Sequence, residues 1–196
     1  MKVLALGGSG GMGRFSSFAI SNYPNITKVT IADLNEDNAK EFSNLFDDRF
    51  TGIGLDVTDK EHLEKVMSGH DIVLNTTGPF FKFGLPILKS AIKCKCHYFD
   101  ICDDWEPTEE MLKLNDEALK NEITAIVGLG ASPGISNLLG LKAMNELDKT
   151  ESIITGWDVS SAKPEDESSQ KGTNAAMEHG LQQISGEIKV YKDKKY

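Results

Sequence analysis

The sequence has fewer positively charged residues than negatively charged ones, and it has no long apolar run. Twenty-one Lys and Arg residues stand against 30 Asp and Glu residues, which gives a net charge of -9 at pH 7. A surface this acidic repels nucleic-acid phosphates and anionic membranes, so we expect neither as a partner. No apolar run approaches the roughly 18–20 residues that span a bilayer. The composition is that of an ordinary globular protein with enough apolar side chains for a core.

Cysteine is also scarce, and its distribution is not that of a secreted protein. Cys94, Cys96 and Cys102 are odd in number and crowded into one segment, unlike a disulfide framework. Near the N-terminus the apolar stretch from Val3 to Leu6 ends at glycines. It is shorter than the roughly 7–15 residues of a signal-peptide core. We expect a cytoplasmic protein with reduced thiols.

Short β-branched runs alternate with longer amphipathic stretches over the first three quarters of the chain. Strands are predicted over 2–6, 28–32, 52–57, 71–75, 97–101 and 123–128. Helices are predicted over 12–22, 36–46, 60–67, 83–93, 109–119 and 135–147. Strands that are apolar on both faces and alternate with helices indicate an α/β fold, a doubly wound parallel sheet of the Rossmann type.

The composition changes near residue 150, and we predict a domain boundary there. Residues 161–172 are polar and charged, which is typical of a loop. A strand over 152–160, a helix over 173–184 and a strand over 187–191 are predicted around it. Residues 1–150 are expected to form one domain. Residues 151–196 hold too little apolar material for a core of their own, so we expect them to begin a second α/β domain.

A glycine-rich loop follows the first predicted strand. The pattern G-x-G-x-x-G is met by Gly8, Ser9, Gly10, Gly11, Met12 and Gly13. Residues without a Cβ let the backbone approach a pyrophosphate, which the N–H groups and the dipole of the next helix bind. Asp33 follows at the end of the second strand, where a carboxylate binds the hydroxyls of an adenosine ribose. Together these residues predict a dinucleotide site.

Asp33 also bears on which dinucleotide binds. A carboxylate at this point repels a 2′-phosphate, and residues 34–37 contain no arginine to receive one. NAD is therefore favoured over NADP. Lys40, one or two helical turns further on, keeps NADP as the alternative.

Two further strand ends belong to the predicted cofactor site. Asp56 and Val57 end the third strand, where residues lie beside the adenine, but they are equally typical of the approach to a helix N-cap. The fourth strand ends in a turn that we expect beside the nicotinamide ribose, unless it is a plain strand-to-helix turn. This turn follows Asn75 and consists of Thr76, Thr77, Gly78 and Pro79.

Four segments in this order resemble the saccharopine dehydrogenase-like family of NAD(P)-dependent oxidoreductases. They are VLALGGSGGMG, VTIADLN, VLNTTGPFFKFGLPILKSAIKCKCHYFDICDD and GLGASPGISNLLG, all within about residues 1–145. The resemblance implies a Rossmann domain followed by a substrate domain, and hydride transfer at a C–N bond of an amino-acid-like or amine substrate. Such a substrate domain is longer than 151–196, so we expect the chain to be a fragment. The sequence holds no signal for or against a homodimer.

The resemblance also has a departure. Relatives often carry an Asp-Pro-Gly turn where this chain has Ser132, Pro133 and Gly134, so a lysine-like substrate is not implied. Cys102 and Asp103 are the candidate catalytic residues, because they follow the fifth strand and its carboxyl end faces the same crevice. A carboxylate beside the nicotinamide stabilises a protonated imine or accepts an amine proton. Alternatively, Asp103 or Asp104 caps the next helix.

The remaining patterns are weak. On a strand, Cys94 and Cys96 face one side and His97 the other, a poor start for tetrahedral ligation, so we expect no metal. Tyr191 and Lys195 have the spacing of a short-chain dehydrogenase pair, but they lie in a charged terminal run. Two alternatives to the dehydrogenase remain, which are a dinucleotide-binding sensor without turnover and a short-chain-type reductase.

Overall fold

A computed structural model of the chain describes residues 1–156, 180–181 and 185. The chain divides into two compact units, Met1–Ile153 and Ile154–Tyr196. All the strands and helices named below belong to the first unit.

The predictions for the second unit fall mostly on residues that the structure does not describe. Residues 152–156 are not in a strand, contrary to the strand predicted over 152–160. Gly180 and Leu181 are helical. The rest of the helix predicted over 173–184, and the strand predicted over 187–191, lie outside the described residues. The assignment of 151–196 to a second domain stays a prediction.

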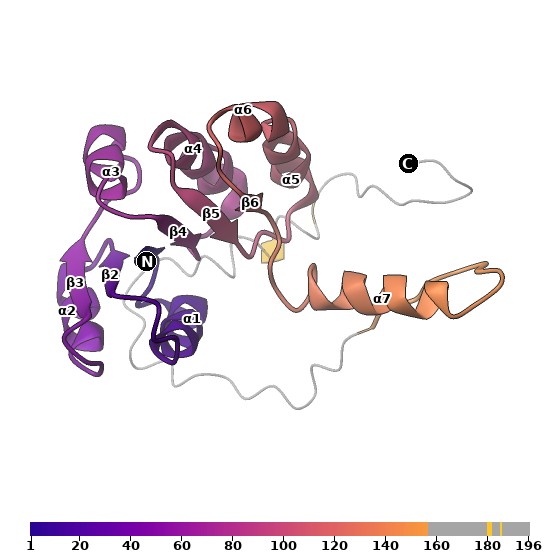
Figure 1. Cartoon of the computed structure of the whole chain (residues 1–196), viewed down its shortest axis with the longest axis horizontal. Coiled ribbons are helices and arrows are strands. Elements are labelled where there is room, and N and C mark those ends of the chain that lie inside the picture. The colour runs from indigo at the N-terminus through magenta and orange to yellow at the C-terminus, as the bar shows by residue number, and fades with distance from the viewer. Residues whose placement is uncertain (157–179, 182–184, 186–196) are drawn as a thin grey trace. The chain divides into compact units, whose positions relative to one another are not determined.

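The first unit is built on one parallel sheet of six strands (Figure 1). The strands are β1 (Lys2–Leu6), β2 (Lys28–Asp33), β3 (Phe50–Gly54), β4 (Ile72–Asn75), β5 (His97–Asp100) and β6 (Ala125–Ile126). Their order in the sheet is β3-β2-β1-β4-β5-β6. This order confirms the predicted doubly wound fold. The direction of winding reverses between β1 and β4, the point at which such sheets bind ligands at the carboxyl ends of the strands.

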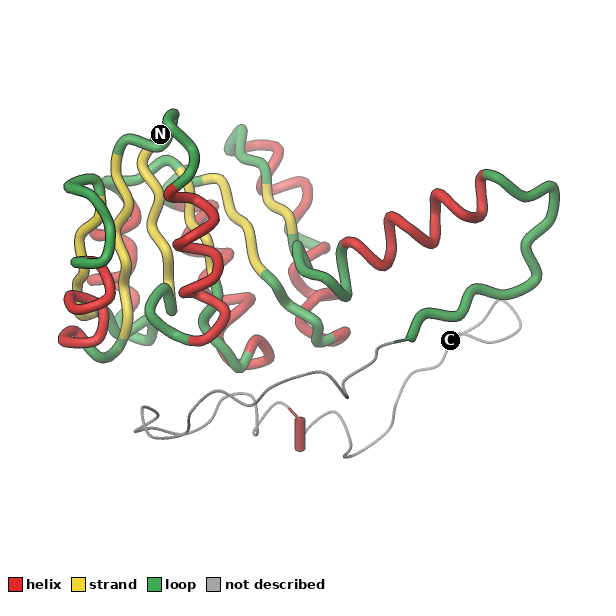
Figure 2. Tube along the Cα trace, turned by 90° about the horizontal axis from the view of Figure 1, so that it is seen from below, coloured by secondary structure: helices red, strands yellow, loops and turns green. Residues whose placement is uncertain are grey.

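Helices follow the strands and lie on both faces of the sheet (Figure 2). They are α1 (Gly11–Ser21), α2 (Glu36–Ser43), α3 (Lys60–Met67), α4 (Phe80–Lys93), α5 (Trp105–Leu112), α6 (Asn115–Lys120) and α7 (Ile135–Asn145). The single helix predicted over 109–119 was wrong, because the chain bends between α5 and α6. The strand predicted over 52–57 begins and ends earlier, as β3, so Asp56 and Val57 lie in the loop after it.

Alternation along β1 divides the core between the two faces. Leu4 and Leu6 are fully buried in a cluster that includes Leu63 of α3 and Ile87 of α4. Val3 points the other way and joins the cluster of α2. Because successive side chains of a strand face opposite sides, a strand buried on both faces must be apolar throughout. The buried part of β1, from Val3 to Leu6, meets that requirement.

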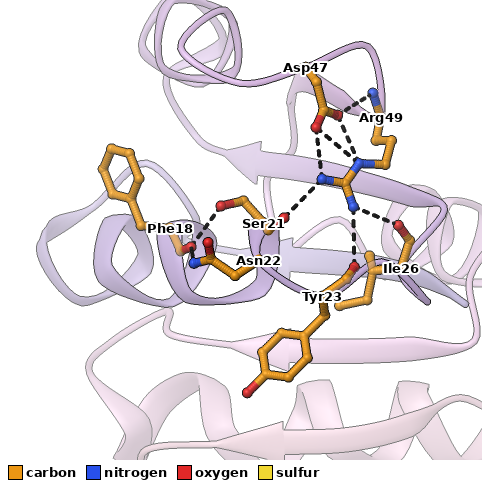
Figure 3. A network of polar contacts seen from close by, with 7 residues as sticks. All are labelled: Phe18, Ser21, Asn22, Tyr23, Ile26, Asp47 and Arg49. Carbon is orange, nitrogen blue, oxygen red and sulfur yellow. Dashed lines mark hydrogen bonds and ion pairs between the residues drawn. The ribbon is translucent and has the colours of Figure 1, made fainter.

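Arg49 ties the carboxyl end of α1 to the loop before β3 (Figure 3). Its guanidinium donates to the backbone carbonyls of Ser21, Tyr23 and Ile26 at 2.8, 3.2 and 2.9 Å. It is also paired with Asp47 at 2.7 Å, and these hydrogen bonds lower the pKa of the Asp47 carboxyl. The last carbonyls of a helix have no partner within it, so Arg49 satisfies that of Ser21 in α1 and also binds two carbonyls of the following loop.

α7 differs from the other helices in having no buried residue. Its exposed apolar side chains are Ile135, Leu138, Leu139, Leu141 and Met144. None of the helices in the described part of the chain has both the length and the apolar character to cross a membrane.

Candidate functional site

The glycine loop joins β1 to α1 by a close approach of backbone to backbone. Gly7 has a φ of 66°, and the N–H groups of Gly7 and Gly8 donate to the carbonyl of Ala32 at 2.9 and 3.3 Å. A Cβ on Gly13 would lie 2.0 Å from the Gly7 carbonyl oxygen. The first turn of α1 therefore rests directly on the loop, and only glycine fits at position 13.

The outer side of this loop is open and unshielded. A Cβ added to Gly11, the first residue of α1, would meet nothing within 4 Å. No side chain caps the helix at Gly10, and its first turn contains no acidic residue. Since the first N–H groups of a helix have no partner within it, they are available to an anion, which the helix dipole also attracts. This geometry fits a diphosphate.

Asp33 lies beside the glycine loop. The Ser9 hydroxyl donates to Asp33 Oδ2 at 2.7 Å, and the Asn35 N–H approaches Oδ1 at 3.5 Å. The carboxylate is half-buried at the end of β2, and each oxygen keeps lone pairs for another donor. The structure thus brings together the two parts of the predicted site that lie 24 residues apart in the chain.

The cations near α2 are already engaged. Lys40 pairs with Glu36 at 2.5 Å on the exposed side of the helix. Arg14 was not singled out from the sequence, yet its guanidinium lies 4.4 Å from the centre of the Phe42 ring, between α1 and α2. Its place directly after Gly13 is visible in the sequence, but its direction depends on how the two helices pack.

The turn after β4 packs against the glycine loop. Thr76 donates from its N–H to the Leu6 carbonyl at 2.9 Å, and its hydroxyl lies 2.9 and 3.1 Å from the carbonyls of Leu6 and Gly7. A Cβ on Gly7 would come within 3.1 Å of Thr77. The Thr77 hydroxyl is buried and has no hydrogen-bond partner among the described residues. The next peptide bond, between Gly78 and Pro79, is cis.

The loop after β3 forms a local turn. Asp56 Oδ1 accepts from the N–H and the hydroxyl of Thr58 at 2.8 and 2.7 Å, which lowers the pKa of Asp56. Asp59 then caps α3 by accepting from the His62 N–H at 3.1 Å. Val57 is half-buried against the core. These hydrogen bonds are typical of the segment that leads into a helix. A position beside the adenine stays a prediction for Asp56 and Val57.

The fifth strand ends in a buried polar cluster. Asp100 Oδ1 accepts from the N–H groups of Gly128 and Cys102 at 2.8 and 3.0 Å, and Oδ2 accepts from the Tyr98 hydroxyl at 2.8 Å. All of these groups are removed from solvent, and burial raises the pKa of Asp100. The sequence gives no signal for this cluster, because the contact with Gly128 depends on how the segment after β6 packs beside β5.

The two predicted catalytic residues have different surroundings. The Cys102 thiol is fully buried and lies 3.6 Å from the Asp104 carbonyl and 3.5 Å from the Thr108 hydroxyl. Burial removes this thiol from solvent and raises its pKa to about 11, so it stays protonated near neutrality. Asp103 is exposed, while Asp104 is buried at the N-cap of α5. A proton-transfer role therefore suits Asp103 better than Cys102.

The cysteines near β5 have separate partners. The Cys96 thiol lies 3.3 Å from the carbonyls of Met67 and His70, whereas Cys94 approaches the Glu64 carbonyl at 3.5 Å. Within the part of the chain that the structure describes, no three His, Cys, Asp or Glu side chains gather in a group that could hold a metal ion.

Comparison with known proteins places this geometry in a family. Residues 3–126 match the family model for the saccharopine dehydrogenase NADP-binding domain. The chain belongs to this family. The match covers β1 to β6 and includes the glycine loop, Asp33 and the turn after β4, so a nicotinamide dinucleotide is the cofactor of this fold.

Relatives of known identity carry the same family name. The saccharopine dehydrogenase [NADP(+), L-glutamate-forming] of Schizosaccharomyces pombe is 29% identical over 105 residues, which are 54% of this chain and 22% of that protein. Its Saccharomyces cerevisiae counterpart is 31% identical over 97 residues, or 50% of this chain and 21% of that protein. The apo structure of the Saccharomyces cerevisiae enzyme matches with a TM-score of 0.64 at 28% identity, covering 74% of this chain and 31% of that one. The chain thus matches less than a third of its relatives' length.

Proposed function

We propose that the chain supplies the cofactor-binding part of an NAD(P)-dependent oxidoreductase that transfers a hydride at a C–N bond of an amino-acid-like or amine substrate. The observation that carries this proposal is the open N-terminus of α1, placed beside Asp33 at the reversal of strand order. The family membership supports the cofactor, and the relatives' names support the type of substrate.

In this proposal, different residues of the site bind different parts of the cofactor. The loop from Gly8 to Gly13 receives the diphosphate on the N–H groups of α1, and Asp33 accepts from the adenosine ribose. Asp56 and Val57 lie on the adenine side, and the turn from Thr76 to Pro79 lies beside the nicotinamide ribose. When bound, the nicotinamide supplies the hydride acceptor. Asp103 holds or accepts a proton of the substrate nitrogen.

The preference for NAD over NADP is part of the proposal. It rests on the Asp33 carboxylate, on the absence of arginine from residues 34–37, and on the pairing of Lys40 with Glu36. The relatives named above carry NADP(+) in their names, so NADP is the alternative that binding measurements must test.

A sensor that binds the dinucleotide without turnover is the second candidate function. The observation in its favour is Ser132 in the turn where relatives often have an aspartate. Assay of the full-length protein, including its substrate domain, with a panel of amino acids and amines, in the presence of each dinucleotide, distinguishes the two. Turnover supports the enzyme, whereas tight binding without any turnover supports the sensor.

Direct titration with NADH and NADPH tests the site itself. We expect binding by the wild-type chain and its loss in Gly10→Val, because a Cβ at Gly10 already lies 3.2 Å from the Gly7 carbonyl and the added methyl groups enter the phosphate space. Unchanged affinity in a folded Gly10→Val variant would contradict the assignment of the loop.

A further inference from the structure

Three buried side chains link the end of β5 to the turn after β4. The Tyr98 hydroxyl donates to Asp100 Oδ2 at 2.8 Å, and Asn75 Nδ2 donates to the Tyr98 oxygen at 3.0 Å. The Asn75 side-chain carbonyl then accepts from the Thr77 N–H at 3.0 Å. Asn75, Tyr98 and Asp100 are each fully buried. We call these three residues the Asp100-Tyr98-Asn75 chain.

The donors and acceptors allow the hydrogen bonds of the Asp100-Tyr98-Asn75 chain to point in one direction only. An ionised Asp100 only accepts, so the Tyr98 proton points toward it and the phenol oxygen is left to accept from Asn75. The Asn75 amide must then present its nitrogen to Tyr98 and its oxygen to Thr77. Asp100 is itself fixed by the N–H groups of Cys102 and Gly128, at the ends of β5 and β6. Every member therefore specifies the orientation of the next.

The Asp100-Tyr98-Asn75 chain contacts only one half of the turn after β4. Thr76 is held separately, by its bonds to Leu6 and Gly7 in β1 and the glycine loop. Thr77 is held by Asn75, and it leads directly into Gly78 and Pro79. Loss of the Asp100-Tyr98-Asn75 chain should release the half of the turn that follows Thr76, while the glycine loop keeps its contacts.

We propose that the Asp100-Tyr98-Asn75 chain positions the Thr77–Pro79 half of the turn for the nicotinamide riboside half of the cofactor. The inference rests on the proposed cofactor site and goes beyond it, because none of the three side chains needs to touch the cofactor. They are positioning residues that act through the Thr77 backbone.

Tyr98→Phe tests the proposal, because it removes one hydroxyl and leaves the ring in place. The dissociation constants of NADH and of ADP are measured by titration; ADP carries only the adenine half and the diphosphate. If NADPH binds more tightly, NADPH and adenosine 2′,5′-bisphosphate are used. We expect the dissociation constant of the dinucleotide to rise about tenfold, which corresponds to about 1.4 kcal/mol. That of the adenine-half probe should stay within about twofold.

Two further variants keep the test decisive. Tyr23→Phe is the matched control, because Tyr23 is exposed and its change should leave both constants unaltered. Asp100→Asn retains the size of the side chain but presents a donor to the phenol, so it should show the same selective loss as Tyr98→Phe. It also replaces that variant if Tyr98→Phe does not fold.

The outcomes separate this proposal from the one on which it depends. A selective loss of dinucleotide affinity supports the positioning role. Equal losses for both probes, or no loss for either in a folded variant, would overturn it while leaving the cofactor site intact. If the wild-type chain binds neither probe, the proposed cofactor site fails, and the positioning role fails with it.

Discussion

The hydroxyl of Ser9 donates a hydrogen bond of 2.7 Å to Oδ2 of Asp33. One residue lies in the glycine loop and the other at the end of β2, so the bond joins the diphosphate part of the proposed site to its ribose part. With this oxygen held, the carboxylate presents its remaining lone pairs in a fixed direction.

Asp33→Ala should weaken NADH binding by at least about tenfold, since hydrogen bonds to a charged group contribute roughly 1.5–3 kcal/mol. NADPH binding should fall less, because the substitution also removes a charge that repels the 2′-phosphate. Parallel titrations of both dinucleotides measure the effect. Equal losses for NADH and NADPH would count against a ribose-binding role.

Ser9→Ala should lower NADH affinity by a smaller factor, about threefold to tenfold, because Asp33 remains but is no longer oriented. Ser9→Thr keeps the hydroxyl and serves as the matched control, with affinity close to that of the wild type. If Ser9→Ala and Ser9→Thr lose affinity alike, the orienting bond is not the cause.

Gly13→Ala and Gly11→Ala form a matched pair of substitutions in the same turn. The first places a methyl group 2.0 Å from the Gly7 carbonyl, and we expect it to cost roughly 1–3 kcal/mol of unfolding free energy and to abolish dinucleotide binding. The second meets nothing within 4 Å and should keep or raise stability, by up to about 1 kcal/mol. Denaturant unfolding measures both. Similar stability in the two variants would contradict the close packing of loop and helix.

Stability should fall in alkaline solution because of two buried thiols. Burial raises the pKa of both Cys96 and Cys102 to about 11, from a reference value of 9.0. Between these pH values the unfolded chain loses the thiol protons while the folded chain keeps them. The folded state then binds more protons, so unfolding free energy falls as pH rises, by up to about 1.4 kcal/mol per pH unit for each thiol.

Urea unfolding from pH 8 to pH 11 measures this slope, with the Cys96→Ala, Cys102→Ala double variant as the comparison. The variant is expected to be less stable at neutral pH but to have a shallower alkaline slope. The same slope in both proteins would show that other groups cause the loss.

Arg49→Met should lower the melting temperature by several degrees, because the carbonyls of Ser21 and Ile26 lose the Arg49 donor and that of Tyr23 keeps only the Ile26 N–H (Figure 3). Asp47→Asn should have a smaller effect, since Arg49 keeps those three bonds. Thermal unfolding followed by circular dichroism compares them. A larger effect for Asp47→Asn would indicate that the ion pair, rather than the bonds to the three backbone carbonyls, is the stabilising feature.

The parallel sheet and the glycine loop were predictable from local patterns. The apolar runs of β1 and β4 mark buried parallel strands, and the glycines with Asp33 mark the site, since these signals lie within short stretches of sequence. The bend between α5 and α6 was missed because the amphipathic pattern runs through it.

Contacts between segments that are distant in the sequence were harder to predict. Alternation along β5 places Tyr98 and Asp100 on one face, but their bonds to Asn75 and Gly128 depend on the register of β4, β5 and β6. Likewise, position after β5 suggested chemistry for Cys102, whereas packing against α5 buries its thiol. The direction of Arg14 depends on helix packing in the same way.

The bare surface of α7 has a practical consequence for work on this chain. Its leucines and isoleucine face water, and contiguous exposed apolar side chains of this kind promote adhesion between molecules. Light scattering of concentrated samples should therefore rise with ionic strength. Salt weakens the mutual repulsion of these strongly acidic molecules and lets the apolar faces of α7 associate.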